Sequence, residues 1–274
     1  MSALHHRLTV ARDLAQHAGA LALRLRPPPG AAQGTLKGRQ DWLTEADGAV
    51  EHFISEHLHA HFPGDGFQGE EAGRTRDGAL RWVVDPIDGT SNFARGGTRW
   101  CVSIGLIGDG MPLLGVLAAP ARHEVYAGLA GAGATLNGAP LRAAGTTDLN
   151  RAIIEAGWSS RIDNAAYLAL CARIVASGAM LRSGGSGALG LAEVAAGRLD
   201  AYTELHINVW DCAAAMAILA EAGAVTNAFL PASMTTGGPI LAAAPGIAAS
   251  VAALTGLALQ PLRDDVPQPH RTQA

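Results

Sequence analysis

Apolar residues recur at helical spacing in two segments near the N-terminus. In residues 3–26, leucine and alanine return every three or four positions, a spacing that predicts an amphipathic helix. The run Pro27-Pro28-Pro29-Gly30 ends this helix, because proline cannot continue the backbone hydrogen-bond ladder. A glycine-containing segment to about residue 40 is predicted to be a mobile loop. A second apolar stripe predicts a helix over residues 44–61, before a Pro63-Gly64 turn.

Between residues 81 and 142, the pattern of apolar positions changes to a period of two residues. Large apolar residues there alternate with smaller ones, which is typical of a strand with one buried face. Asp109-Gly110 and Asn137-Gly138 are dipeptides that favour tight hairpin turns. This stretch therefore predicts an antiparallel sheet packed against the first two helices. The alternation is formed by Trp100, Val102, Ile104 and Leu106.

Strands and helices alternate after about residue 145, which is the rhythm of an α/β unit. Strands are predicted over residues 152–156 and 239–244, the second leading into a final helix. Helices are predicted over 165–177, 186–196 and 209–222, and glycine ends the last two. We therefore expect an N-terminal α+β half (1–145), a C-terminal α/β half (146–263) and a disordered tail (264–274).

Composition excludes several classes of protein. The 274 residues are 49% hydrophobic and carry a net charge of −4 with no basic run, so a nucleic-acid partner is not expected. No apolar stretch approaches the ~20 residues that span a bilayer, and no signal peptide is recognised. The three cysteines, Cys101, Cys171 and Cys212, lie far apart, as in a protein with reduced thiols. The sequence predicts a cytoplasmic protein without a membrane partner.

The most informative segment runs from Trp82 to Phe93. A buried apolar strand ends there in two carboxylates, Asp85 and Asp88, with Pro86 between them. Carboxylates at the end of a strand repel each other and lose solvation unless a cation neutralises them. The following Gly89-Thr90-Ser91 can open a short helix whose free N–H groups face an anion. The structural alternative is a strand followed by an Asp-Gly turn.

Three other acidic segments each have an ordinary structural explanation. Gly69-Glu70-Glu71 could be a solvated loop. Asp47 follows Thr44 by three residues, the spacing of a helix-capping box, and Asp211 stands in the first turn of a helix that Asn208 could cap. Capping and catalysis do not exclude each other, because both place the acid at a helix N-terminus.

Taken together, these segments resemble the inositol monophosphatase family, in the wider group that includes fructose-1,6-bisphosphatases. The central Asp-Pro-Ile-Asp-Gly-Thr motif is highly specific, and the resemblance covers nearly the whole chain. Residues 184–189 and 194–202 also look like the family's second half. The resemblance implies a layered αβαβα sandwich with a metal-containing cleft between its two halves.

The resemblance also implies a role for each site residue. Glu70, Asp85 and the carbonyl of Ile87 look like ligands of a first Mg²⁺, and Asp85, Asp88 and Asp211 like ligands of a second. Glu70 also lies near a weaker third ion in this reading, so two to three ions are implied, and Mn²⁺ could replace Mg²⁺ because every donor is a hard oxygen. Thr90 and Asp47 match the pair that activates the attacking water. The phosphate-binding backbone matches Gly89, Thr90 and Ser91.

Substrate choice is less strongly determined. Glu204 matches a family acid that binds a substrate hydroxyl, and Gly185 and Ser186 match the wall of the same pocket. A carboxylate acceptor suits a polyol, a sugar or an amine, so an inositol phosphate and histidinol phosphate both remain as substrates. Lys37 and His206 are given no firm role. The i, i+4 pair His57 and His61 is interpreted as part of a solvated face.

The resemblance carries three expectations about behaviour. Family members are commonly homodimers, so a homodimer is expected. Lithium is expected to inhibit at the second metal site. Some bacterial members also associate with the transcription machinery, so a regulatory binding role, either added to catalysis or in its place, is the alternative from a different class.

Overall fold

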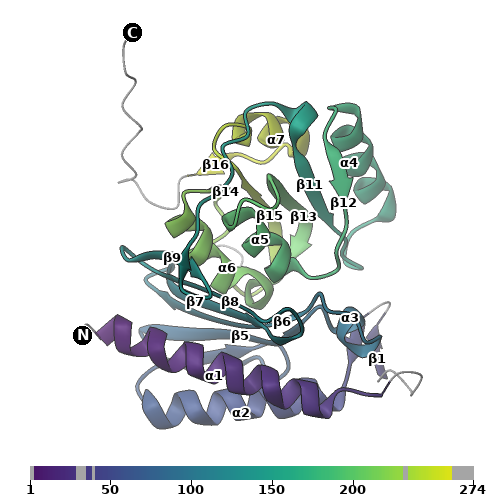
Figure 1. The fold of residues 1–274 in the computed structure, drawn as a ribbon. Coiled ribbons are helices and arrows are strands. Elements are labelled where there is room, and N and C mark those ends of the chain that lie inside the picture. The colour runs from purple at the N-terminus through teal and green to yellow at the C-terminus, as the bar shows by residue number, and fades with distance from the viewer. Residues whose placement is uncertain (1–2, 29–34, 39–40, 231–233, 261–274) are drawn as a thin grey trace.

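The computed structural model describes residues 3–28, 35–38, 41–230 and 234–260. Figure 1 shows five layers: a pair of helices, a sheet, a middle layer of helices, a second sheet and outer helices. This is the αβαβα sandwich that the sequence predicts. Among the described residues, no helix is both long enough and apolar enough to span a membrane. The predicted disordered tail from residue 264 lies outside the described residues.

Helices α1 (Ala3–Leu25) and α2 (Glu45–His61) form the first layer, as predicted. Thr44 caps α2 through a capping box with Asp47. The apolar stripe of each helix packs on the first sheet. Its fully buried members are Ala11, Ala15, Ala18, Ala22, Ala46, Val50 and Ile54.

The segment between these helices is not simply a loop, so that part of the prediction is wrong. It contains an antiparallel hairpin of β1 (Thr35–Gly38) and β2 (Asp41–Leu43). Strands this short show no readable alternation of apolar and polar residues, which explains why the pattern did not reveal them.

The first sheet runs in the order β10-β9-β8-β7-β6-β5-β3-β4 among the described residues. Its neighbours are antiparallel except β3 and β5, which are parallel, so the predicted antiparallel sheet needs that correction. The sheet also begins earlier than predicted, at Gly66. Both predicted hairpin turns are present, with positive φ at Asp109, Gly110, Asn137 and Gly138. The strands are β3 (Gly66–Gly69), β4 (Arg74–Arg76), β5 (Leu80–Asp88), β6 (Cys101–Gly108), β7 (Met111–Ala119), β8 (Glu124–Leu129), β9 (Gly133–Leu136) and β10 (Ala139–Pro140).

The second sheet runs in the order β12-β11-β13-β15-β14-β16 among the described residues. Only β11 and β15 correspond to predicted strands. The four others are two to seven residues long. The sequence pattern did not predict strands in these segments. The strands are β11 (Ile153–Gly157), β12 (Met180–Arg182), β13 (Ala201–Ile207), β14 (Val225–Asn227), β15 (Gly238–Ala243) and β16 (Leu259–Gln260).

The helices of this half lie where the sequence places them. α5 and α6 form the middle layer, and α4 and α7 cover the outer face of the second sheet (Figure 1). Short helices also follow β5, β7 and β10. The bounds are α3 (Thr90–Ala94), η1 (Pro120–Arg122), η2 (Leu149–Arg151), α4 (Asn164–Ala176), α5 (Gly187–Ala195), α6 (Val209–Ala222) and α7 (Ala248–Thr255).

Helix α6 approaches the first sheet along a row of glycines. Gly105, Gly115 and Gly128 are cross-strand partners on β6, β7 and β8. A Cβ atom at Gly115 would lie 1.9 Å from the carbonyl oxygen of Ala214 on α6. The helix therefore rests on bare backbone, and Asp211 in its first turn is placed by this contact. Because a helix of the C-terminal half packs so closely on the N-terminal sheet, the boundary near residue 145 stays a prediction.

A buried ionic network also joins the two halves. Arg99, just before β6, donates to Glu155 on β11 at 2.6 Å and to Glu193 on α5 at 2.8 Å. Arg122 donates to the other oxygen of Glu193 at 2.8 Å. Both glutamates are at most 3% exposed, so these pairs are shielded from solvent ions. We name Arg99, Arg122, Glu155 and Glu193 the interhalf network.

Candidate active site

A cavity of about 390 Å³ opens where β5, β11, β13 and the N-termini of α3, α5 and α6 meet. Every site residue predicted from the sequence lines it except Asp47, which lies behind Thr90. The structure therefore brings these residues together, while their individual roles stay predictions. The predicted residues in the lining are Glu70, Asp85, Ile87, Asp88, Gly89, Thr90, Ser91, Gly185, Ser186, Glu204 and Asp211.

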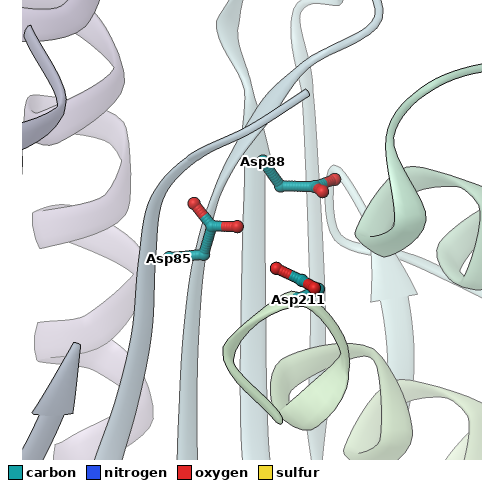
Figure 2. Close-up of side chains that lie close together, drawn as sticks. All are labelled: Asp85, Asp88 and Asp211. Carbon is teal, nitrogen blue, oxygen red and sulfur yellow. The ribbon is translucent and has the colours of Figure 1, made fainter. Parts of the chain in front are cut away.

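Three carboxylates form the floor of the cavity. Asp85, Asp88 and Asp211 each offer an oxygen atom within 4.8 Å of the other two. Figure 2 shows Asp85 and Asp88 arriving from the end of β5 and Asp211 from the start of α6. Residues 126 positions apart in the sequence thus meet, because the glycine row holds α6 against the sheet that β5 belongs to.

Local hydrogen bonds hold two of these carboxylates. The Asp85 Oδ1 atom accepts from the backbone N–H of Ile87 at 2.8 Å, which turns the side chain back along the strand end. Asp211 Oδ2 accepts from the backbone N–H of Asn208 at 3.0 Å and completes a capping box. The capping interpretation of Asp211 is therefore correct, and it coexists with a place in the cavity.

Asp88 has partners that the sequence did not predict. Its Oδ2 atom accepts from the Ser186 hydroxyl and from the N–H of Ala188 at 3.0 Å, and its Oδ1 atom from the N–H of Gly187 at 3.2 Å. Asp88 thus binds the first N–H groups of α5, which have no partner within the helix. In Figure 2 its carboxylate turns toward that helix. The Cys101 thiol also donates to Oδ2, at 3.9 Å. Oδ1 has two lone pairs and accepts from Gly187, so this oxygen can still bind a further group.

The electrostatics of the floor favour a cation. Burial, followed by the charges of Glu70, Asp88 and Asp211, raises the pKa of Asp85 well above its usual range. Burial raises the pKa of Asp88 as well, although its bonds to α5 act against the shift. Burial and the charge of Asp88 raise the pKa of Asp211. The buried Asp85 and Asp88 and the half-buried Asp211 resist ionisation together, and they are stabilised when a positive charge lies between them.

Glu70 and Ile87 lie at the same end of the cavity. Glu70 follows β3, and its backbone N–H donates to the carbonyl of Val84 at 3.1 Å, which places it beside the end of β5. The carbonyl of Ile87 accepts from the Thr90 hydroxyl at 2.9 Å. Carboxylate and carbonyl oxygens are the donors that Mg²⁺ and Mn²⁺ prefer. The donor set therefore fits the ion that the sequence predicts.

The Thr90 hydroxyl lies between two acceptors. It is 2.9 Å from the Ile87 carbonyl and 3.5 Å from Asp47 Oδ1, and one hydroxyl hydrogen can serve only one of them at a time. Asp47 is buried, and its Oδ2 atom accepts from the N–H of Thr44 at 2.8 Å and from the Thr44 hydroxyl at 2.6 Å. Asp47 is therefore fixed by the α2 cap with Oδ1 directed at Thr90.

The Gly89 backbone allows α3 to begin beside the carboxylates. Its φ of 89° is a left-handed conformation that favours glycine. A Cβ atom at this position would also lie 2.8 Å from the carbonyl of Arg99 and 3.2 Å from that of Gly185. Asn92 bridges the same two segments, since its Nδ2 donates to the carbonyls of Arg99 and Gly184, both at 2.9 Å. The predicted phosphate segment is thus packed against the Gly185 wall.

Further polar groups lie where β11 and β13 line the cavity, a part that we call the distal end. Glu204 on β13 is 8% exposed there, and His206 also lines the cavity. Asn208 lines it beside Asp211. His206 Nε2 lies 2.9 Å from the carbonyl of Thr236. The side chain of Lys37 lies outside the described residues.

The sequence interpretation missed the segment from Trp158 to Arg161, which lines this end after β11. A signal existed, because ligands of α/β units bind beyond the carboxyl ends of the strands, and β11 is a predicted strand. Glu204 and Gly157 are partners on the parallel strands β13 and β11, so both strands end at this cavity.

Comparison with known proteins gives one consistent result. The family model described as the inositol monophosphatase family matches residues 3–264. A protein named Nus factor SuhB from Xylella fastidiosa is 41% identical over 68% of this chain and 69% of its own length. An inositol-1-monophosphatase from Synechocystis is 37% identical over 73% of this chain and 72% of its own.

Solved structures agree with the fold. The structure of inositol monophosphatase from Anabaena superposes with a TM-score of 0.80 and 31% identity, covering 92% of this chain and 96% of that one. The extragenic suppressor protein SuhB from Bartonella henselae gives a TM-score of 0.84 with 29% identity, covering 95% of this chain and all of the other.

Proposed function

The chain belongs to the inositol monophosphatase family, and we propose that it is a magnesium-dependent phosphatase of small polyol or sugar phosphate monoesters. The observation that carries this proposal is the convergence of Asp85, Asp88 and Asp211 on the floor of one cavity. Membership of the family supports a phosphatase. The metal, the substrate and the residue roles are our proposals.

The residues proposed to hold the ions are Glu70, Asp85, Asp88, Asp211 and the carbonyl of Ile87. The raised pKa values of the three aspartates support this assignment, because burial and mutual repulsion both favour a bound cation. When bound, two to three Mg²⁺ or Mn²⁺ ions would activate a water molecule and neutralise charge on the phosphoryl and leaving oxygens.

The protein residues supply positioning and proton transfer. Thr90 and Asp47 are proposed to orient the attacking water and to accept its proton, with Asp47 Oδ1 as the final base. The capping bonds from Thr44 hold Asp47 in place. The N–H groups of Gly89, Thr90 and Ser91 precede the first intrahelical bond of α3, which Asn92 donates to Gly89. They are therefore proposed to bind the phosphoryl oxygens.

Glu204, Gly185 and Ser186 are proposed to contact the leaving group. Glu204 is an acceptor in the lining of the same cavity, and Gly185 and Ser186 lie against Gly89 of the phosphate segment. The volume of about 390 Å³ accommodates a cyclic polyol or a sugar. Histidinol phosphate is the alternative substrate, with an ammonium group against Glu204.

Phosphate release from a panel of esters tests this function. After treatment with a chelator, the protein is expected to be inactive on every ester, and Mg²⁺ or Mn²⁺ is expected to restore turnover of inositol and sugar monophosphates. Lithium in the millimolar range is expected to inhibit. A preference for histidinol phosphate above about 100-fold, roughly 2.7 kcal/mol of transition-state binding, would instead assign that substrate. Activity that survives complete removal of metal would contradict the proposal.

A regulatory binding role is the second candidate, and it is favoured by the relatives named Nus factor SuhB. Such a role would be additional to catalysis, because all the proposed metal-binding residues are present. Affinity capture of RNA polymerase by the purified protein, with and without Mg²⁺, tests it. We expect capture to be equal for the native chain and an inactive Asp211→Asn variant. The absence of capture under both conditions would remove this role.

The homodimer stays a prediction from the family resemblance, and the cytoplasmic location stays a prediction from the sequence. Sedimentation of the purified chain is expected to give twice the mass of 28.0 kDa.

A further inference from the structure

Tyr202 and Glu204 form a short buried contact at the distal end of the cavity. They stand two residues apart on β13, so their side chains share one face of the strand. The phenol donates to Glu204 Oε2 at 2.5 Å, a distance typical of a charge-assisted hydrogen bond. Tyr202 is 1% exposed and Glu204 is 8% exposed.

Three glycines make room for this pair. A Cβ atom at Gly157 on β11 would lie 2.3 Å from both the phenol oxygen and Glu204 Oε2. One at Gly190 on α5 would lie 2.4 Å from the Tyr202 ring, and one at Gly187 would lie 2.8 Å from Ile207 Cδ1 and 3.2 Å from the phenol oxygen. None of these three described glycines has a positive φ, so the backbone conformation does not require glycine. At Gly157 and Gly190 the space for the Tyr202 side chain requires it, and at Gly187 the nearest side chain is Ile207.

Glycine in a helix or strand costs roughly 0.5–1 kcal/mol relative to alanine. The fold accepts this cost at Gly190 in α5 and at Gly157 on the neighbouring strand, and a Cβ atom at either position would clash with the Tyr202 side chain. The Tyr202 side chain is therefore held in the cavity wall by contact with rigid backbone rather than with flexible side chains. Its hydroxyl has little freedom to move away from Glu204.

The phenol has one hydrogen, and Glu204 Oε2 receives it. This contact fixes the rotation of the carboxylate and leaves Oε1 for a donor that enters the cavity. Burial raises the pKa of Glu204 to about 7, and the hydrogen bond from Tyr202 acts in the opposite direction. The contact thus favours an ionised acceptor with one fixed orientation.

We propose that Tyr202 is a positioning residue that fixes Glu204 as the acceptor for a hydroxyl or ammonium group of the leaving group. Tyr202 would thereby determine the preference for esters that carry such a donor over esters that lack one. This inference rests on the proposed phosphatase function, and it adds the source of substrate selectivity.

The Tyr202→Phe variant tests the proposal with two substrates. One is the best substrate of the panel that carries a hydroxyl or ammonium donor, and the other is p-nitrophenyl phosphate, whose leaving group has none. We expect the ratio of their kcat/KM values to fall about tenfold, mainly through a higher KM for the donor-bearing ester. The kcat/KM for p-nitrophenyl phosphate should change by less than about twofold, because a hydrogen bond to a charged group is lost only from the distal end.

The chain provides a matched control. Tyr126 on β8 donates to Glu124 Oε2 at 2.9 Å, with the same two-residue spacing and a fully buried ring, but this pair lies outside the cavity lining. Tyr126→Phe is expected to leave the selectivity ratio unchanged. Glu204→Gln should lower the ratio at least as much as Tyr202→Phe, and the double variant should lower it no further, because the two residues act as one unit.

Each outcome has a distinct meaning. Equal losses on both esters in Tyr202→Phe would show a merely structural role, and an unchanged ratio would show no role; either result overturns the proposal. If the native protein hydrolyses neither ester with Mg²⁺, the phosphatase function itself is wrong and this inference is wrong with it. Should Tyr202→Phe be recovered unfolded, Gly157→Ala replaces it, because the added methyl group would displace the same contact and should lower the ratio.

Discussion

Replacing Asp211 with asparagine is expected to lower kcat by on the order of 10³ while the chain stays folded. The substitution removes one negative charge from the proposed metal ligands, and metal catalysis contributes several kcal/mol. The asparagine carbonyl can still accept from the N–H of Asn208, so the α6 cap is retained. Turnover at saturating Mg²⁺ is the measurement.

The same variant, although it loses activity, is expected to keep or gain stability. The pKa of Asp211 is raised in the folded state, so the folded protein binds its proton more tightly than the unfolded chain does. An acid of this kind lowers stability as the pH rises from its unfolded pKa through its folded pKa. In a chelator at pH 8, Asp211→Asn should therefore unfold at the same temperature as the native chain or at a higher one.

Asp200→Asn is the matched control for this experiment. Asp200 is buried and, like Asp211, accepts from a backbone N–H, that of Ile153 at 2.7 Å, but it does not line the cavity. We expect this variant to retain turnover within about threefold. Near-normal turnover of Asp211→Asn at saturating Mg²⁺ would show that Asp211 is not a required ligand.

Adding a methyl group at Gly115 is expected to destabilise the fold by about 3 kcal/mol or more. Overpacking usually costs 1–3 kcal/mol, and the larger values arise where the neighbour cannot move. Here the neighbour is the backbone of α6, since the new Cβ would lie 1.9 Å from the Ala214 oxygen and 2.6 Å from its carbonyl carbon. The free energy of unfolding of Gly115→Ala in urea measures the effect.

Gly48→Ala gives the contrasting result. Gly48 lies within α2, and a Cβ there would meet nothing within 4 Å. Alanine should therefore stabilise the protein by up to about 1 kcal/mol, because it is the better helix former. A loss of less than about 1 kcal/mol in Gly115→Ala would show that α6 can shift away from the glycine row without cost.

The parts of the structure that could be predicted are those whose signals are local. The stripes of α1 and α2 follow from spacing within each helix, and the turns at Asp109-Gly110 and Asn137-Gly138 follow from dipeptides that tolerate positive φ. The Asp85 and Asp88 pair was identified as candidate chemistry because two acids at the end of an apolar strand need a partner. None of these inferences requires knowledge of distant contacts.

The parts that could not be predicted depend on distant segments. Asp88 accepts from residues 98 to 100 positions away, and no property of its own neighbourhood indicates α5 as the partner. The parallel pairing of β3 with β5 depends on the sheet as a whole. Gly157 and Gly190 read as ordinary turn or helix residues until Tyr202 is placed between them.

The interhalf network limits how this enzyme can admit its substrate. Arg99, just before β6, and Arg122, in η1 after β7, bind Glu193 together, and Arg99 also binds Glu155. Swinging the halves apart about a hinge would break the three shortest of these contacts and leave the two buried glutamates with the longer contacts to Arg182, at 3.7 Å from Glu155 and 3.5 Å from Glu193. Loss of the closer partners of a buried charge costs several kcal/mol. Substrate entry and product release should therefore proceed by local displacement of the 158–161 segment, on the faster timescale of loop motion. Turnover should be insensitive to cross-links that join the two halves at positions away from this segment.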